Sequence, residues 1–307
     1  MQGVRSGPES PDAELHVIDP PRDRQWPAGA DRMPRLPWRR LRGIGSAASY
    51  LALPVGLLIV WQWLVTAGWV NGRLIPGPAD ILEAWWNWFF GGSGSEGAAL
   101  GMVAFSGSGF ASVGASAGRV ALGFSLSCAI AIPLGISIGE WSLVRRLVDP
   151  TLQFFRPIPV TAWIPFAIVI FGIRNASAVF LVFMAAFFPL LLNGTAGVRE
   201  VPLNYIRAAQ MLGGRRDQIM TRVVFRAALP GILTGMRLGL GFAWTSVVVA
   251  EMLAVKSGVG YVLWNSYYLF RMDQLGAAML TMGILGFATD LTMRWLMHRL
   301  VGWSLRG

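Results

Sequence analysis

Apolar runs separated by short polar segments make up most of the chain after residue 50. Several runs approach the roughly 20 residues that an α-helix needs to cross the hydrocarbon core of a membrane. We therefore predict an all-α membrane protein with about six transmembrane helices. The expected spans are residues 50–69, 112–139, 160–171, 176–192, 231–254 and 275–297. The third is the weakest, because it is short and bracketed by prolines that can break or tilt it.

Small residues recur in two of these spans at a spacing that places them on one helix face. Gly114 and Gly118 stand four residues apart in the second span, and Gly235 and Gly239 do so in the fifth. Small residues at this spacing let two membrane helices approach closely. We expect both pairs to lie at helix–helix contacts.

The composition supports a membrane protein, since 54% of the residues are apolar and only 14% are charged, against roughly 25% charged in soluble proteins. The mean hydropathy is +0.52. The first forty residues differ, because they are rich in Pro, Asp and Arg and contain no apolar run, so we expect no signal peptide there. We expect residues 1–45 to form a disordered cytoplasmic tail and residues 46–307 to form the transmembrane domain.

The net charge of +10 is carried almost wholly by arginine, since Lys256 is the only lysine. The arginines cluster in loops beside the apolar runs, and such a distribution determines the orientation of membrane proteins. This distribution argues against nucleic-acid binding. One set of loops contains Arg35, Arg39, Arg40, Arg42, Arg145, Arg146, Arg156, Arg199, Arg207, Arg215, Arg216, Arg222, Arg226, Arg299 and Arg306; the other contains Arg73, Arg174, Lys256 and Arg271. This asymmetry predicts that both termini and residues 202–228 are cytoplasmic.

Residues 202–228 form a polar interruption between two spans and contain a helix, a glycine joint and a second, amphipathic helix. The first helix is expected to stop at Gly213 and Gly214, and we expect a positive φ at Gly213. The second helix would begin near Arg215. Its apolar stripe is Met220, Val223, Val224 and Ala227. Such a helix pair can rest on the inner leaflet or dock into a groove of a soluble partner, and the pattern alone does not decide between these.

The stretch from Arg207 onward resembles the cytoplasmic signature loop of ATP-binding cassette importer permeases, which is a Glu-Ala-Ala triplet followed after three residues by Gly and later by an apolar residue and Leu-Pro. Two positions depart from this pattern: Arg207 replaces the acidic residue, and Phe225-Arg226 occupies the Leu-Pro position. The resemblance implies an ATPase-coupling role for Arg207, Ala208, Ala209, Gly213, Val223, Leu229 and Pro230.

Further stretches narrow the resemblance to permeases for nitrate, bicarbonate, taurine, alkanesulfonates and aromatic compounds. They include LIPGPADIL at 74–82, SAGRVALGF at 116–124 and FPLLLNGTAGVREVP at 188–202. The resemblance implies a multi-pass permease of the inner (plasma) membrane that imports a small anionic solute. Its expected partners are cytoplasmic ATP-binding subunits, a second permease copy in a homodimer, an extracytoplasmic solute-binding protein and membrane lipid. ATP and Mg²⁺ would be bound by the partner ATPase, and no cofactor is expected in this chain.

Four charged residues lie within or at the ends of apolar runs: Arg119, Arg237, Glu251 and Asp290. An ionised group in mid-membrane costs at least about 2.5 to 3.5 kcal/mol unless it is paired or hydrated, so such residues are functional candidates. We name Arg119, Arg237 and Glu251 as candidates for the translocation pathway. The alternative is that each snorkels to an interface or pairs with a neighbour and serves packing.

Residue chemistry argues against other functions. Cys128 is the only cysteine and His16 and His298 the only histidines, so we expect neither a catalytic site nor a metal site. The chain also lacks the G-x-x-x-x-G-K-[ST] sequence that cradles phosphate in many ATPases. A secondary transporter or channel driven by an ion gradient remains the alternative to an importer permease, and a membrane enzyme is the more distant one.

Overall fold

The computed structural model describes residues 45–91, 105 and 107–302, and all regular elements among them are helices. The chain divides into two units, residues 1–56 and 57–307. The first unit holds the start of α1 (Gly45–Thr66). The second unit contains α2 (Pro78–Phe90), α3 (Gly109–Glu140), α4 (Ser142–Phe155), η3 (Val160–Trp163), α5 (Ile164–Phe171), α6 (Asn175–Arg199), α7 (Leu203–Met211), α8 (Arg216–Gln218), η4 (Ile219–Val224), α9 (Phe225–Leu253), α10 (Val259–Tyr268) and α11 (Met272–Val301).

Four helices in the described residues are long and apolar enough to cross a membrane. They are Gly109–Glu140, Asn175–Arg199, Arg216–Leu253 and Met272–Val301, and they agree with four of the expected spans. The described apolar part of α1, Ala52–Thr66, is shorter than a full span. The structure thus supports four spans, or five with one bent pair, and the expected total of six stays a prediction.

The bent pair replaces the expected third span. Ser142–Phe155 and Val160–Phe171 are apolar enough for a span only when taken together, and they meet at an angle of 89°. Pro157 and Pro159 lie between them, and proline removes a backbone donor and disfavours helix in the preceding residue. The flanking prolines do interrupt the helix, as expected, but the break lies before Val160, so residues 160–171 form one arm of a longer bent segment that begins at α4.

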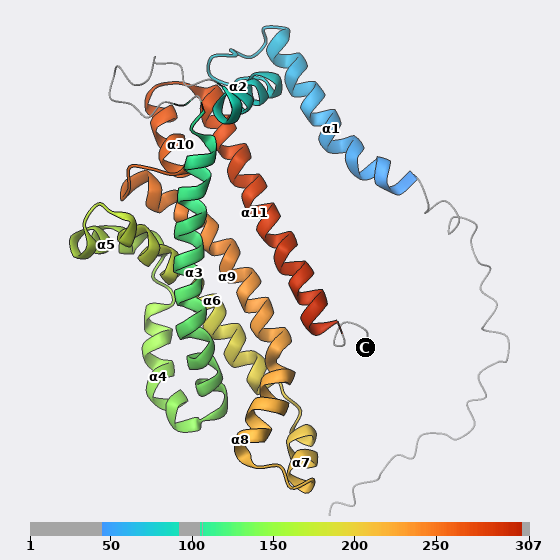
Figure 1. Ribbon diagram of the computed structural model, residues 1–307. Helices are drawn as coiled ribbons and strands as arrows, with labels where there is room; N and C mark the ends of the chain where they lie inside the picture. Colours follow the sequence, from blue (N-terminus) through green and yellow to red (C-terminus); the bar gives the residue numbers. More distant parts are fainter. Residues whose placement is uncertain (1–44, 92–104, 106, 303–307) are drawn as a thin grey trace, which may run out of the picture. The chain divides into compact units, whose positions relative to one another are not determined.

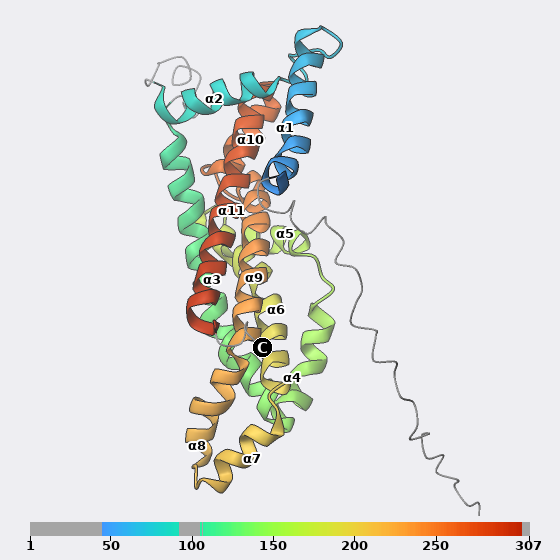
Figure 2. The ribbon, with the colours of Figure 1, turned by 90° about the vertical axis from the view of Figure 1, so that its right-hand side faces the viewer.

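Helix α6 is the centre of the second unit, and α3 and α9 pack along it over most of its length (Figures 1 and 2). The shared core is apolar and includes Val182, Leu190, Leu191 and Val247, each at most 1% exposed. At the crossing with α9, a Cβ added to Gly231 would lie 2.7 Å from the Cα of Gly197. The two backbones can approach this closely only because both residues lack a side chain.

The two predicted small-residue pairs have different outcomes. A Cβ on Gly235 would lie 2.8 Å from the Cβ of Asn193, and one on Gly239 would lie 3.2 Å from the Ala186 carbonyl, so this pair lies at the contact with α6. For Gly114 and Gly118 no described atom would lie within 4 Å of an added Cβ. That expectation was wrong within this chain, because the spacing defines a helix face but not whether another helix covers it.

Candidate functional site: the α7–α8 segment and the charged residues of the spans

The segment from α7 to η4 forms one end of the second unit, opposite α2 and α10 (Figures 1 and 2). Pro202 is the N-cap of α7, and the amides of Leu212, Gly213 and Gly214 donate to carbonyls of the last turn at 3.0–3.1 Å. Gly213 has φ +75°, which confirms the predicted positive φ. The glycine joint therefore ends α7 and turns the chain toward α8.

The second arm of the segment differs from expectation. Residues Arg216–Leu253 form one continuous helix of 38 residues, which includes α8, the π-helical turn η4 and α9. The sequence predicted a separate amphipathic helix before the fifth span. Pro230 was expected near that boundary but lies inside α9, because a helix can accommodate one proline with a local adjustment when its surroundings hold the backbone. The segment that begins at Arg216 and the fifth span therefore belong to one continuous helix.

The two alanines of the signature triplet face different surroundings. Ala209 is half-buried and packs with Ile206 against a cluster that contains Val201, Ile219 and Val224. Arg207 and Ala208 are exposed. Of these two alanines, only Ala208 is therefore exposed toward a possible partner, while Ala209 packs α7 against the bundle.

The outermost part of this segment carries two apolar side chains that the sequence argument missed. Met211 and Leu212 are 90% and 88% exposed, and they precede the glycine joint directly. Exposed apolar residues beside polar ones are typical of protein–protein contact sites. Their position just before the predicted helix stop was the feature of the sequence that could have indicated their exposure. Of the remaining coupling candidates, Val223 is half-buried against the same cluster as Ala209.

Arg119 and Glu251 form a buried ion pair between α3 and α9. Their side chains are 4% and 0% exposed, and Nη1 lies 2.5 Å from Oε1. Arg119 also donates to the Asn175 side chain at 2.9 and 3.0 Å and to the carbonyl and hydroxyl oxygens of Ser257. Every charge-bearing atom in this network therefore has a partner within the chain.

The carboxylate of Glu251 is equally well satisfied. The Ser116 hydroxyl and the Gly260 amide each donate to Oε2 at 2.9 Å. The Val259 amide in turn donates to the Ser116 hydroxyl oxygen at 3.0 Å. These bonds connect α3 and α9 to the start of α10. Glu251 is therefore paired with neighbouring groups, which was the alternative to a role in the translocation pathway.

Arg237 forms a second pair, between α9 and α11, that is only partly buried. Its Nε and Nη2 donate to the two Asp290 oxygens at 2.5 and 3.1 Å, and the Arg294 Nε donates to Asp290 at 2.8 Å. The Arg237 side chain is 38% exposed and that of Asp290 30%. Arg237 and Glu251 are separated by about 21 Å along α9 at 1.5 Å per residue. Of the three pathway candidates, Arg119 and Glu251 are therefore brought together, and Arg237 is not.

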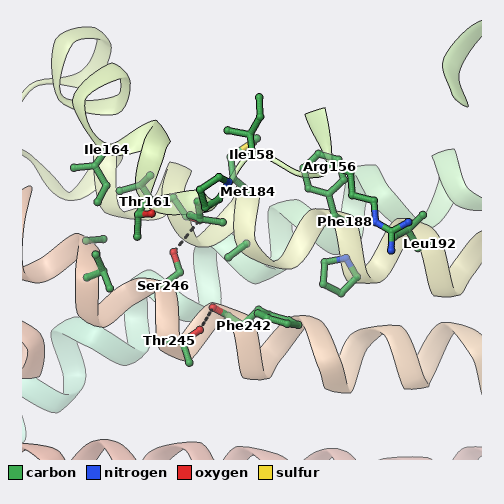
Figure 3. A pocket seen from close by; sticks show the side chains of 17 residues that line it. Arg156, Ile158, Thr161, Ile164, Met184, Phe188, Leu192, Phe242, Thr245 and Ser246 are labelled. Atoms are coloured by element: carbon green, nitrogen blue, oxygen red, sulfur yellow. Dashed lines mark hydrogen bonds between the residues drawn. The ribbon is translucent and has the colours of Figure 1, made fainter. Parts of the chain in front are cut away.

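A cavity of about 620 Å³ lies between α6, α9 and the segment that joins α4 to α5, and we call it the α6–α9 cavity. Its wall includes Arg156, which the sequence argument counted only among the arginines that orient the chain. Figure 3 shows side chains of the two helices facing each other across this space.

Comparisons with known proteins identify the family. Residues 131–302 match the binding-protein-dependent transport system inner membrane component family. The nitrate import permease protein of Synechocystis sp. is 34% identical over 238 residues, which cover 76% of this chain and 82% of the relative. The taurine transport system permease protein of Escherichia coli is 32% identical over 273 residues, which cover 88% and 96%.

The fold has a solved counterpart in the MetNI methionine ABC transporter in inward-facing conformations. The TM-score is 0.56 at 18% identity, and the match covers 62% of this chain and 95% of the other. These findings confirm the family resemblance and favour an importer permease over an ion-driven transporter. The chain therefore belongs to the binding-protein-dependent transport system inner membrane component family: it is a multi-pass inner-membrane permease subunit of an ATP-binding cassette importer, a transport component rather than an enzyme, and it works with ATPase partners.

Proposed function

We propose that this permease imports a small anionic solute and that residues 202–228 are the element through which the ATPase moves it. The observation that carries the coupling proposal is the exposed end of α7, with Met211 and Leu212, joined by Gly213 to a helix that runs without a break into a span. A displacement of this end would be transmitted along α9 as a rigid body. The names of the nitrate and bicarbonate relatives support an anionic solute, and taurine, although zwitterionic, carries a sulfonate group.

The remaining partners follow from the same proposal. A second copy of this chain would complete the pathway, since one copy offers too little wall, and an extracytoplasmic solute-binding protein would deliver the solute. The transmembrane domain, residues 46–307, would contact lipid directly, while residues 1–45 would form a cytoplasmic tail. ATP and Mg²⁺ would be held by the partner ATPase, so this chain would need no cofactor.

Bulk or strain at the exposed end of α7 tests the coupling proposal. We expect Ala208→Trp to weaken ATPase association about tenfold, because overpacking a protein groove typically costs about 1 to 3 kcal/mol. Gly213→Val should leave an inserted permease whose transport is lost, since a β-branched residue is strongly disfavoured at a positive φ. The measurements are ATPase pull-down from detergent and coupled transport in proteoliposomes.

Two matched variants control for non-specific damage. Gly213→Asn should retain most transport, because asparagine adopts the left-handed region more readily than valine. Ala79→Trp places the same bulk on an exposed residue of α2, at the opposite end of the second unit, and should leave ATPase association unchanged. Full association and full coupled transport in both Ala208→Trp and Gly213→Val would favour a helix that rests on lipid instead.

Cysteine labelling tests the proposed orientation, in which α7, α8 and both termini are cytoplasmic. Single cysteines would replace Arg222 and Lys256, both exposed, in a Cys128→Ala background. We expect a membrane-impermeant thiol reagent to label Lys256→Cys in intact cells and Arg222→Cys only after lysis, because basic loops are retained inside. The reverse labelling pattern would overturn the orientation.

A further inference from the structure

The α6–α9 cavity has an apolar wall with few free hydrogen-bond donors. Met184 and Phe188 line it from α6, and Phe242 and Val249 line it from α9. The Ser246 hydroxyl donates to the Leu181 carbonyl at 3.1 Å, so its hydrogen is engaged within the wall. A solute inside this part of the cavity therefore meets mainly carbon.

Arg156 is the exception in this wall. It is the one charged residue among the 17 that line the cavity, and it directly follows the last residue of α4. No described residue forms a hydrogen bond or ion pair with its guanidinium, which lies at one end of the cavity beside Leu192 (Figure 3). A guanidinium offers five N–H donors in a planar fork that matches carboxylate and sulfonate oxygens. Arg156 is exposed, so these donors face water, which an anionic ligand group at the cavity can replace.

A second cavity of about 520 Å³ adjoins the first, and Arg156, Phe188 and Leu192 line both. Its other polar residues, Asp149 and Gln153, lie on α4 and are hydrogen-bonded to each other at 3.2 Å. The Asp149 carboxylate makes this second space unfavourable for an anion. A negatively charged group that reaches Arg156 is therefore favoured from the α6–α9 side.

Size and polarity together narrow the ligand class. Cavities of roughly 300 to 1,000 Å³ hold organic ligands of many atoms, and a bare inorganic anion would leave most of the apolar wall uncovered. Such an anion would also lose hydration against an apolar wall with a single cation to replace it. An organic anion avoids both penalties, because its charged head can reach Arg156 while its hydrocarbon part covers the wall.

We propose that the α6–α9 cavity is a solute site for organic anions with an apolar body, such as aryl or alkyl sulfonates and carboxylates, and that Arg156 determines its specificity. This proposal rests on the proposed import function and selects among its solutes, favouring organic sulfonates or carboxylates over nitrate and bicarbonate. An anionic lipid has the same chemistry, with a charged head and an apolar body, and the test distinguishes it from a free solute.

Calorimetric titration of the permease–ATPase complex in phosphatidylcholine nanodiscs tests the site. The probes are benzenesulfonate, neutral benzenesulfonamide and nitrate, without any solute-binding protein. We expect the Kd of benzenesulfonate to be at least about tenfold lower than that of either other probe, because only it combines the charge with the ring. Arg156→Gln should remove this preference, and Arg156→Lys should retain part of it.

Two further variants control for the site. Arg146→Gln removes an exposed charge from α4 that does not line the cavity, and it should leave the Kd unchanged. Thr245→Phe fills the cavity from an exposed position on α9 and should abolish binding of both ring compounds. Unchanged benzenesulfonate binding in Arg156→Gln, or equally tight nitrate binding in the unmodified protein, would overturn the proposal.

The lipid alternative and the proposed function are tested in the same preparation. If phosphatidylglycerol in the nanodiscs prevents benzenesulfonate binding to the unmodified complex, the cavity is a lipid site and the solute assignment fails. ATP hydrolysis is measured in parallel. A complex that assembles and hydrolyses ATP but does not bind benzenesulfonate contradicts the cavity assignment alone, whereas failure of the chain to associate with any ATPase contradicts the import function.

Discussion

Replacing Arg119 by methionine is expected to destabilise the folded permease by about 3 to 5 kcal/mol, because it leaves the Glu251 carboxylate buried without its cation. Glu251 is 0% exposed, so water cannot take over the role of the guanidinium. The same change removes the bonds from Arg119 to Asn175 and Ser257. Thermal unfolding of the detergent-solubilised protein, followed by size-exclusion chromatography, measures the loss.

Two controls separate the missing charge from the missing packing. The double variant Arg119→Met/Glu251→Leu should recover part of the stability, because no buried charge is left unpaired. Arg237→Met should have a smaller effect, since its ion pair is 30–38% exposed and solvent screens it. An unchanged melting temperature in Arg119→Met would contradict this account. Loss of uptake in Glu251→Gln, with the folded complex intact, would instead support the pathway role that the sequence suggested.

Replacing Gly231 by valine is expected to separate α6 from α9 and to abolish assembly of a folded permease. The new Cβ would lie 2.7 Å from the Gly197 Cα and 3.2 Å from the Asn193 carbonyl oxygen. Both obstacles are backbone atoms that cannot move aside as a side chain can, so the cost should exceed the about 1 to 3 kcal/mol typical of overpacking. The yield of monodisperse protein after membrane extraction measures the effect.

A matched substitution on the same helix isolates the steric cause. Gly241 also lies in α9, but no described atom would lie within 4 Å of a Cβ there. Gly241→Val changes helix propensity by the same amount as Gly231→Val and should leave the yield close to that of the unmodified protein. If the two variants lose the same yield, the close approach of α6 and α9 is not the reason.

Four of the six expected spans could be predicted from the sequence because each depends on a local property, the length of an apolar run. The same property failed where proline divides a run, and residues 160–171 proved to be half of a bent pair. It also failed to locate the start of the fifth helix. The amphipathic segment from Arg216 and the apolar run from Gly231 form one helix without a break.

The site residues were harder to interpret, because their roles depend on distant neighbours. Arg119 and Glu251 are separated by 132 positions in the chain, and no periodicity relates them, so the sequence could only mark both as costly in a membrane. Arg156 follows an apolar run as the orienting arginines do, and only the bend at Pro157 brings it to a cavity. Gly213 was predictable, since a helix stop between two helices requires its backbone conformation.

The π-helical turn η4 allows the continuous helix from α8 to α9 to change its length. A π turn holds more residues than an α turn, so one residue removed from Ile219–Val224 can be absorbed by a return to regular α-helix. The same deletion in the middle of α9 would turn everything before it by about 100° about the helix axis. In η4 the chain can therefore become shorter while the helix turn before it and the span after it keep their directions.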